Sequence, residues 1–301
     1  MGRVKIVTDS TAYLEASVVK TLGITVVPLA VRLDDETFQE GVDITAEEFF
    51  QKLARSSTMP MALPPSVGDF LAVYTELSKT TDQIMSIHLS SKLSKTCDRA
   101  AVATQAFLGR CEIAVVDSLT TSLGLGILAT AAAQAAAQGQ SLEEIEFLIR
   151  GMIPRIYIAF LAGTLKYLER DGRIGQAQAL LGAMLNIKPF LTIEDGEIIP
   201  LEKVRDSEGA VDKLFEFVGE FSQIEQMAII QSTPDPIEET KMLIERLEVI
   251  FPKVKPPILV YGPVLACHVG PDGLGVIVYE GPSGRIREGK FGGQREVWYN
   301  W

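Results

Sequence analysis

Cysteine and histidine are scarce in this sequence of 301 residues. There are three cysteines, Cys97, Cys111 and Cys267, and two histidines, His88 and His268. The cysteines are too few and too widely spaced for a disulfide framework or a cysteine-based zinc site. No pair of carboxylates stands at the spacing of metal ligands. We therefore expect neither a metal nor a cofactor, and we expect reduced, buried thiols.

Basic residues are outnumbered by acidic ones, with 28 Lys and Arg against 39 Asp and Glu and a net charge of −11. Nucleic acids and anionic membrane surfaces both favour proteins with an excess of Lys and Arg. The charge balance argues against both of these partners. A small anion is still compatible with it, because a few local donors suffice to hold one.

Long apolar runs are also missing, although apolar residues make up 47% of the chain. The longest apolar stretch, around residues 123–137, is rich in Ala and contains Gly and Gln. It falls short of the roughly 20 apolar residues that a membrane span needs. The N-terminal residues lack the apolar segment of a signal peptide and instead resemble a first strand. We expect a cytoplasmic protein without stable membrane insertion.

Motifs of common catalytic and nucleotide sites are absent as well. The sequence has no Gly-x-Ser-x-Gly elbow, no His-Glu-x-x-His and no Gly-x-x-x-x-Gly-Lys-Ser/Thr loop. Gly124 and Gly126 match the loose dinucleotide pattern Gly-x-Gly-x-x-Ala. In a dinucleotide site the first glycine directly follows a strand, whereas residues 117–122 intervene here. The pattern therefore predicts two glycines inside a helix, where they serve packing.

Short apolar runs alternate with helical patterns in the first half of the chain. Runs at residues 4–7, 84–89 and 113–116 are each followed by an amphipathic or apolar helical stretch. This alternation predicts an α/β fold with a parallel sheet and helices on both faces. Residues 24–43 predict a hairpin that turns at Asp34-Asp35. Residues 56–69 are rich in Pro, Ser and Met and predict no regular structure.

The pattern changes after Pro154. Strands are predicted at residues 156–161, 187–193, 197–201, 227–231, 258–261, 264–268 and 276–279, with Asp195-Gly196 as a hairpin turn. Hairpins mixed with helices predict an α+β arrangement with a mostly antiparallel sheet. We therefore expect two domains, 1–155 with the hairpin 24–43 inserted and 156–280. Residues 281–301 form a Gly-rich tail with aromatic residues at its end, either disordered or docked.

Hydroxyl side chains follow three of the predicted parallel strands. They cluster at residues 8–11, 90–94 and 118–121 and include Ser10, Ser91, Ser94 and Ser118. The carboxyl ends of parallel strands meet at one edge of the sheet, where ligands bind and helix N-termini offer free N–H groups. Taken singly, each cluster can be only a helix cap. Taken together, they predict a crevice that accepts an anion.

Two further candidates lie in the second half. Arg173 sits in a glycine turn at residues 172–175, where its guanidinium can bind an anion or form a structural ion pair. His268 ends a predicted strand before a Gly-Pro turn and is either a ligand contact or a structural residue.

In this order and spacing the motifs resemble those of the DegV family over roughly residues 4–280. They are found at residues 8–12 (TDSTA), 65–70 (PSVGDF), 90–96 (SSKLSKT), 116–118 (VDS), 165–168 (LKYL), 172–175 (GRIG), 186–189 (NIKP), Arg205 and 268–271 (HVGP). The resemblance implies a two-domain protein that binds one long-chain fatty acid between its domains. It also implies a role like that of the binding subunits of bacterial fatty-acid kinase, which present the acid to a partner kinase. By the same resemblance Ser94 (or Ser91) and His268 hold the carboxylate, with Arg173 near them or at the partner surface.

The chain departs from the family pattern at two places. Ala62 and Leu63 stand where the family has a Thr-Ser pair, and Lys92 and Lys95 replace two glycines. Both lysines lie near the start of a predicted helix, where a cation is disfavoured unless an anion is bound. One hypothesis is that a lysine replaces the missing hydroxyl at position 62. The alternative is that both lysines extend into solvent.

Two other functions remain open from the sequence. A phosphotransferase or hydrolase would use the hydroxyls of the crevice, and a lipid-sensing regulatory module would bind a protein partner. The first lacks a recognisable nucleophile–base pair or phosphate loop. The second is compatible with the carrying of a fatty acid.

Overall fold

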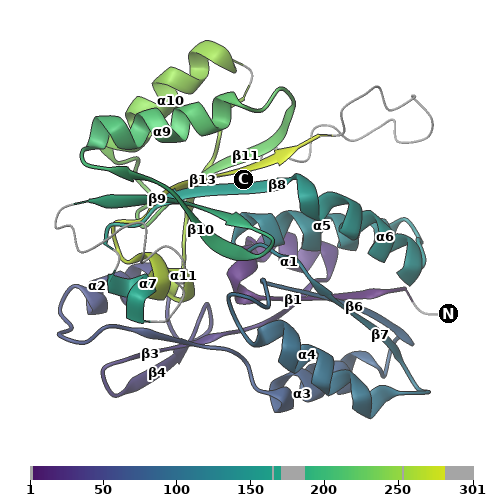
Figure 1. The fold of residues 1–301 in the computed structure, drawn as a ribbon. Helices are drawn as coiled ribbons and strands as arrows, with labels where there is room; N and C mark the ends of the chain where they lie inside the picture. Colours follow the sequence, from purple (N-terminus) through teal and green to yellow (C-terminus); the bar gives the residue numbers. More distant parts are fainter. Residues whose placement is uncertain (1–2, 165, 171–186, 253, 282–301) are drawn as a thin grey trace.

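Two large β-sheets and one small sheet organise the described part of the chain (Figure 1). The computed structural model describes residues 3–164, 166–170, 187–252 and 254–281. The predicted site residue Arg173 and the tail from residue 282 onward lie outside the described residues.

The first large sheet is parallel, with the strand order β2-β1-β6-β7. Successive residues of a strand face opposite sides, so Ile6 and Met85 join one apolar cluster while Val7 and Ile84 join another. Helices cover both faces, which confirms the predicted arrangement. The strands are β1 (Lys5–Asp9), β2 (Thr25–Val27), β6 (Gln83–His88) and β7 (Glu112–Asp117). One face carries α1 (Ala16–Leu22), α5 (Leu123–Ala137) and α6 (Leu142–Met152), and the other α3 (Val67–Leu77) and α4 (Thr96–Thr104).

The predicted hairpin forms a small antiparallel sheet with the order β4-β3-β5. Its turn lies at Asp34, whose φ of 51° is accessible to Asp in a tight turn. The strands are β3 (Ala30–Leu33), β4 (Glu36–Gln39) and β5 (Met61–Leu63), and α2 (Ala46–Leu53) follows the hairpin. The prediction of an irregular segment at 56–69 is wrong, because β5 pairs with β3 and a capping box of Ser66 and Asp69 starts α3. The partner strand lies far away in the sequence, so local composition could not reveal the pairing.

The second large sheet has the order β10-β9-β8-β13-β11-β12 and is antiparallel except between β11 and β12. This confirms the prediction of a mostly antiparallel second sheet, with Asp195 and Gly196 at the β9–β10 turn. The strands are β8 (Ile156–Leu161), β9 (Lys188–Glu194), β10 (Glu197–Val204), β11 (Ile224–Gln231), β12 (Ile258–Val260) and β13 (Leu274–Glu280). Helices α9 (Ser207–Gly219) and α10 (Glu238–Ile250) cover one face.

The segment predicted as a strand at 264–268 is instead the helix α11 (Pro263–Val269). Pro263 occupies the first helical turn, and Gly270 ends the helix with a φ of 78°. Proline at the start and glycine just past the end are strong helix signals, and here they outweigh the apolar character of the segment. His268 therefore lies in the last turn of a helix, not at the end of a strand. The short helix α7 (Lys166–Arg170) packs against α11.

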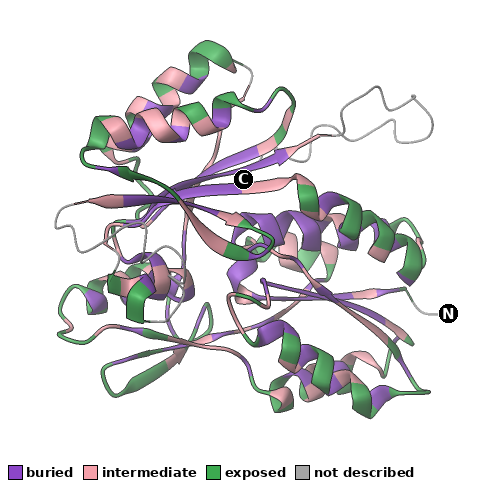
Figure 2. Ribbon diagram, viewed as in Figure 1, coloured by how far each residue is buried: buried purple, intermediate pink, exposed green. Residues whose placement is uncertain are grey.

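Helix α5 lies between the two large sheets, and it contacts β1 and β6 of one and β8 and β13 of the other. Figure 1 shows the resulting layers: α9 and α10 at the top, the second sheet, α5, the first sheet, and α3 with α4 at the bottom. In Figure 2 the two large sheets and α5 are largely buried, and exposed residues lie on the outer helices, the small sheet and the connecting loops. Gly124 and Gly126 lie inside α5, as predicted, so they do not form a dinucleotide loop.

The close approach of α5 generates a stability prediction. A Cβ on Gly126 would lie 2.6 Å from the backbone oxygen of Ala12, whereas a Cβ on Gly151 in α6 would meet nothing within 4 Å. We expect Gly126→Ala to lower the free energy of unfolding by about 1–3 kcal/mol, despite the better helix propensity of Ala. Gly151→Ala should raise it by up to about 1 kcal/mol. Urea unfolding of both variants measures this, and an equal effect of the two would contradict the packing role of Gly126.

Candidate functional site

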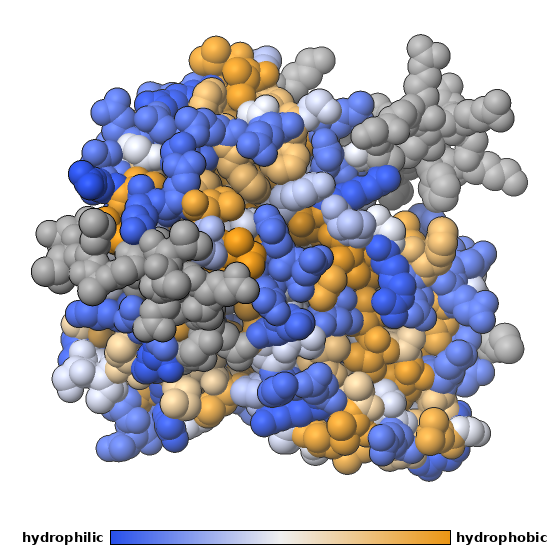
Figure 3. Space-filling view, in the orientation of Figure 1, coloured by the Kyte–Doolittle hydropathy of each residue, from blue (hydrophilic) through white to orange (hydrophobic). Residues whose placement is uncertain are grey.

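Exposed apolar side chains are dispersed over the surface. Among the described residues, the largest exposed fractions belong to residues far apart in the sequence, namely Val42, Leu108, Phe147 and Val249. Figure 3 shows apolar residues in separate groups among hydrophilic ones on one face of the molecule. Among the described residues, no helix combines the length and apolarity required to cross a bilayer.

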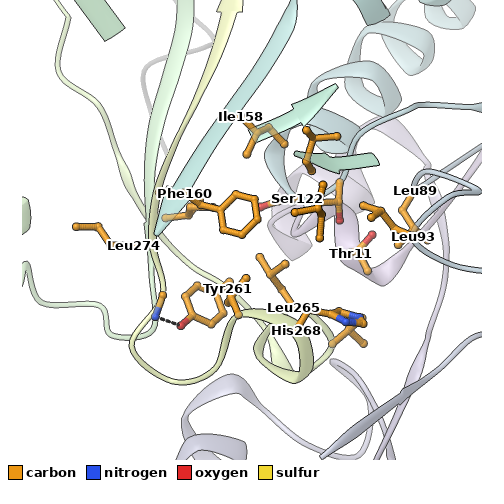
Figure 4. Close-up of a pocket in the computed structure, with 18 of the residues that line it drawn as sticks. Thr11, Leu89, Leu93, Ser122, Ile158, Phe160, Tyr261, Leu265, His268 and Leu274 are labelled. Atoms are coloured by element: carbon orange, nitrogen blue, oxygen red, sulfur yellow. Dashed lines mark hydrogen bonds between the residues drawn. The ribbon is translucent and has the colours of Figure 1, made fainter. Parts of the chain in front are cut away.

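A largely apolar cavity lies between the two large sheets (Figure 4). The space free of protein atoms is about 750 Å³ when the open mouth is counted with it. Its walls come from the second sheet, from α11 and from loops of the first half. The lining residues are Thr11, Leu89, Leu93, Thr121, Ser122, Ile158, Phe160, Leu161, Ile193, Ile198, Ile230, Tyr261, Val264, Leu265, His268, Val269, Gly273, Leu274 and Gly275.

The cavity touches the carboxyl edge of the parallel sheet, which is the edge predicted to bind a ligand. Thr11 follows β1, Leu89 follows β6, and Thr121 follows β7. The wall at this edge is mixed, because the polar Thr11 and Thr121 stand beside the apolar Leu89. Each is the close neighbour of a predicted serine rather than the serine itself.

His268 is the predicted site residue that lines the cavity, where it is half-buried. Its helix α11 packs against β5, which carries Ala62 and Leu63. The fold thus brings together the elements that carry these three residues, although Ala62 and His268 lie far apart in the sequence.

The predicted serines lie near the cavity but outside its lining, and the hydroxyls of Ser10, Ser94 and Ser118 bond to the protein. Ser10 Oγ donates to Glu40 Oε2 at 2.6 Å, and Ser118 Oγ donates to the Thr120 carbonyl at 3.2 Å. Ser94 Oγ lies 2.9 Å from Thr96 Oγ1, and the backbone N–H of Ser91 donates to Asp117. Most of these bonds organise the loops after the strands. None of the four serines is a helix N-cap, because Asp9, Lys95 and Ser122 hold those positions, so the capping interpretation is wrong for these serines.

Lys92 and Lys95 also lie outside the cavity lining. Lys92 Nζ lies 3.2 Å from Glu197 Oε1, and Lys95 Nζ lies 3.0 Å from Asp98 Oδ2. Both side chains are more than half exposed. This placement favours the alternative in which the lysines face solvent.

A buried carboxyl group that the sequence analysis missed fixes the start of α11. Glu40 Oε1 accepts from the backbone N–H of Val264 at 2.9 Å and from the Tyr13 hydroxyl at 3.4 Å. The Tyr13 hydroxyl in turn accepts from the N–H of Leu265. Glu40 lies in the first half and α11 in the second, so only their tertiary contact reveals the role of this residue. No local pattern marked it.

Burial raises the pKa of Glu40 from 4.5 to about 7, and the nearby Asp9 carboxylate adds to this effect. The hydrogen bonds from Ser10 and Val264 act in the opposite direction but are outweighed. The group therefore changes charge near neutral pH while in contact with a helix that lines the cavity.

A nucleophile–base pair, which the sequence analysis did not find, is present but buried. Ser86 Oγ lies 2.7 Å from His88 Nε2, and His88 Nδ1 lies 3.0 Å from Asp9 Oδ2, in the order found in serine hydrolases. All three residues are 0% exposed, and the Tyr74 hydroxyl donates to Ser86 Oγ. None of them lines the cavity. The array therefore stabilises the core beneath Phe70 rather than facing a substrate.

Within the ranges that the structure describes, no group of three or more His, Cys, Asp or Glu residues is placed to hold a metal ion.

The pKa of Glu40 generates a prediction about pH. The folded protein holds this proton more tightly than the unfolded chain, so the contribution of Glu40 to stability is largest below about pH 4.5 and is lost as the pH rises through about 7. The difference corresponds to about 3 kcal/mol. In Glu40→Gln the group cannot ionise, so the gap between the unfolding free energies of variant and parent should change by about this amount between pH 5 and pH 8. Glu47→Gln, at an exposed acid of α2, should leave the pH dependence unchanged.

The comparisons with known proteins agree on one family. The family model described as "Uncharacterised protein, DegV family" matches residues 3–281. A DegV domain-containing protein of Caldanaerobacter subterraneus is 34% identical over 284 residues, which are 93% of this chain and 100% of that protein. The solved structure of a fatty-acid-binding DegV family protein from Thermus thermophilus aligns with a TM-score of 0.81 and 32% identity, covering 92% of this chain and 99% of that one. DegV of Bacillus subtilis, described as a fatty acid binding protein, aligns with a TM-score of 0.83 and 29% identity, covering 93% and 100%. This chain belongs to the DegV family.

Proposed function

We propose that the protein binds one long-chain fatty acid in the cavity between its two large sheets and carries it without transforming it. The observation that carries this proposal is the cavity with largely apolar walls and the half-buried His268 among its lining residues. The fatty-acid-binding descriptions of the Thermus thermophilus and Bacillus subtilis relatives support the same ligand class.

Elementary energetics favour such a ligand. Each CH₂ group transferred from water into an apolar site contributes about 0.8 kcal/mol, so a long acyl chain supplies most of the affinity. A buried carboxylate costs several kcal/mol unless hydrogen-bond donors meet it. The site therefore needs a long apolar wall and a small number of donors. It needs no catalytic base.

For the carboxylate we propose His268 and Ser94 as the main contacts, with Ser91 as the alternative serine and Arg173 as a further donor. His268 lines the cavity, and Ser94 follows Leu93, which also lines it. Ala62 offers no hydroxyl at the position where the family has Thr, so the carboxylate has one side-chain donor fewer. The lysines could contribute only by leaving Glu197 and Asp98, which makes them the weaker candidates.

Catalysis by this chain is the less favoured function, because the Ser86–His88 pair has no exposed atom through which to reach a substrate. We propose that the bound acid is presented to a partner kinase, as the family resemblance implies. A lipid-sensing role with another protein partner is the alternative, and co-purification of a kinase from the native cell would separate the two.

One prediction of the proposed function concerns the ligand that the purified protein carries. Protein purified from cells should carry about one fatty acid per chain, detected by native mass spectrometry and by analysis of the extracted lipid. Added fatty acid should raise the thermal midpoint of delipidated protein, because it binds only the folded state; at 100 times Kd the gain is about 2.7 kcal/mol. A bare polypeptide whose midpoint ignores added fatty acid would exclude this function.

Another prediction distinguishes between the residues proposed to contact the carboxylate. His268→Ala should weaken fatty-acid binding by roughly tenfold or more, because a hydrogen bond to a charged group contributes about 1.5–3 kcal/mol. The double variant Lys92→Gly with Lys95→Gly should stay within about twofold of the parent, as expected for exposed ion pairs. Displacement of a fluorescent fatty acid at low salt measures all affinities. Weak binding by the lysine variant and normal binding by His268→Ala would reverse the assignment.

A further inference from the structure

Ser122 carries a buried hydroxyl without a hydrogen-bond partner in the wall of the cavity. Its relative exposure is 1%, and within the described residues no donor or acceptor reaches its Oγ. The residue lines the cavity, and Figure 4 shows it between Phe160 and Thr11. Buried polar groups are almost always hydrogen-bonded, so an unsatisfied one requires an explanation.

The backbone of Ser122 is unusual as well. Its φ is 56° and its ψ is −143°, a conformation that glycine adopts readily and that residues with a side chain adopt at a cost. The chain thus holds a serine where glycine would be more stable. Strained residues of this kind concentrate at sites that contact ligands.

Ser122 also lies at the start of helix α5, which is a polar environment. Ser122 directly precedes this helix of 15 residues, and no side chain caps its first turn. The start of a helix carries partial positive charge, which favours an oxygen atom nearby. Ile158 and Phe160 of the second sheet, which also line the cavity, are apolar.

Two other hydroxyls of the wall are already bonded. Thr11 Oγ1 donates to Asp9 at 2.6 Å. The Tyr261 hydroxyl donates to the Gly270 carbonyl at 2.7 Å and accepts from the N–H of Gly273 at 3.0 Å. Ser122 therefore differs from these two in that its hydroxyl has no hydrogen-bond partner among the described residues.

We propose that Ser122 forms a subsite for an oxygen atom part-way along the acyl chain, so that the protein favours fatty acids with a mid-chain hydroxyl group. This inference rests on the proposed function, in which His268 on α11 holds the carboxylate and leaves Ser122 to the body of the ligand. A hydroxyl donates and accepts, so it pairs with a ligand hydroxyl in either sense. An acyl chain without a hydroxyl group leaves the Ser122 hydroxyl without a hydrogen-bond partner. Sites with such a buried polar group discriminate strongly against a ligand that lacks the group to pair with it.

The test compares stearate with positional isomers of hydroxystearate that carry the hydroxyl near the middle of the chain. The measured quantity is the ratio of the Kd of stearate to that of each isomer, by displacement of a fluorescent fatty acid from the delipidated full chain. For the best isomer, we expect this ratio to fall roughly tenfold in Ser122→Ala, while the affinity for stearate itself stays unchanged or improves. Ser122→Gly should lower the ratio in the same way and raise the thermal midpoint, because glycine relieves the positive φ.

Thr130→Val is the matched control, because it removes a buried hydroxyl of α5 that already donates to the Gly126 carbonyl at 2.7 Å. Its ratio should equal that of the parent. A ratio that is the same in parent and Ser122→Ala overturns the inference, as does an equal loss for both ligands, which would place the carboxylate at Ser122. If stearate does not bind the parent at all, the proposed function itself fails, and the two failures are thus distinguished.

Discussion

The burial of α5 between the two large sheets is the constraint on which the rest of the structure depends. Twelve of its 15 residues are buried, and a helix that is apolar all round requires cover on every side. Alanines and glycines make this helix thin, so the sheets can approach it from both sides. A single apolar cluster therefore runs from Ile6 in the first sheet through Leu125 to Ile277 in the second. The walls of the cavity are strands and loops that this cluster holds in place.

In this arrangement the two halves of the chain contribute different side chains to the cavity. The second sheet supplies apolar side chains such as Ile158 and Phe160, and the loops of the first half supply hydroxyls. Helix α11 brings His268 to the same space, and the contacts of Glu40 and Tyr13 fix its first turn. The position of α11 thus depends on a carboxyl group whose charge changes near neutral pH. A site of this kind can hold an amphipathic anion with few donors, because the apolar wall contributes most of the affinity.

The buried array of Ser86, His88 and Asp9 shows why residue types alone do not establish chemistry. The same hydrogen-bond order in an open cleft would point to a hydrolase. Here each member is 0% exposed, and the Tyr74 hydroxyl donates to Ser86 Oγ. A functional site needs residues that a ligand can reach, as well as residues of the right type. The open cavity meets this condition, and the buried array does not.

The sequence by itself determined the layers of the fold and the edge of the sheet at which the cavity lies. Periodicity, caps and turn residues act within a few positions, so the parallel sheet, the β9–β10 hairpin and the helical place of Gly124 and Gly126 were all predictable. Only the tertiary structure decided which hydroxyls face the cavity, since Thr11 and Ser122 line it while Ser10 and Ser118 bond elsewhere. It also decided the burial of Glu40 and the pairing of β5, whose partners lie far away in the chain. These features depend on contacts between distant segments, and such contacts leave no local pattern in the sequence.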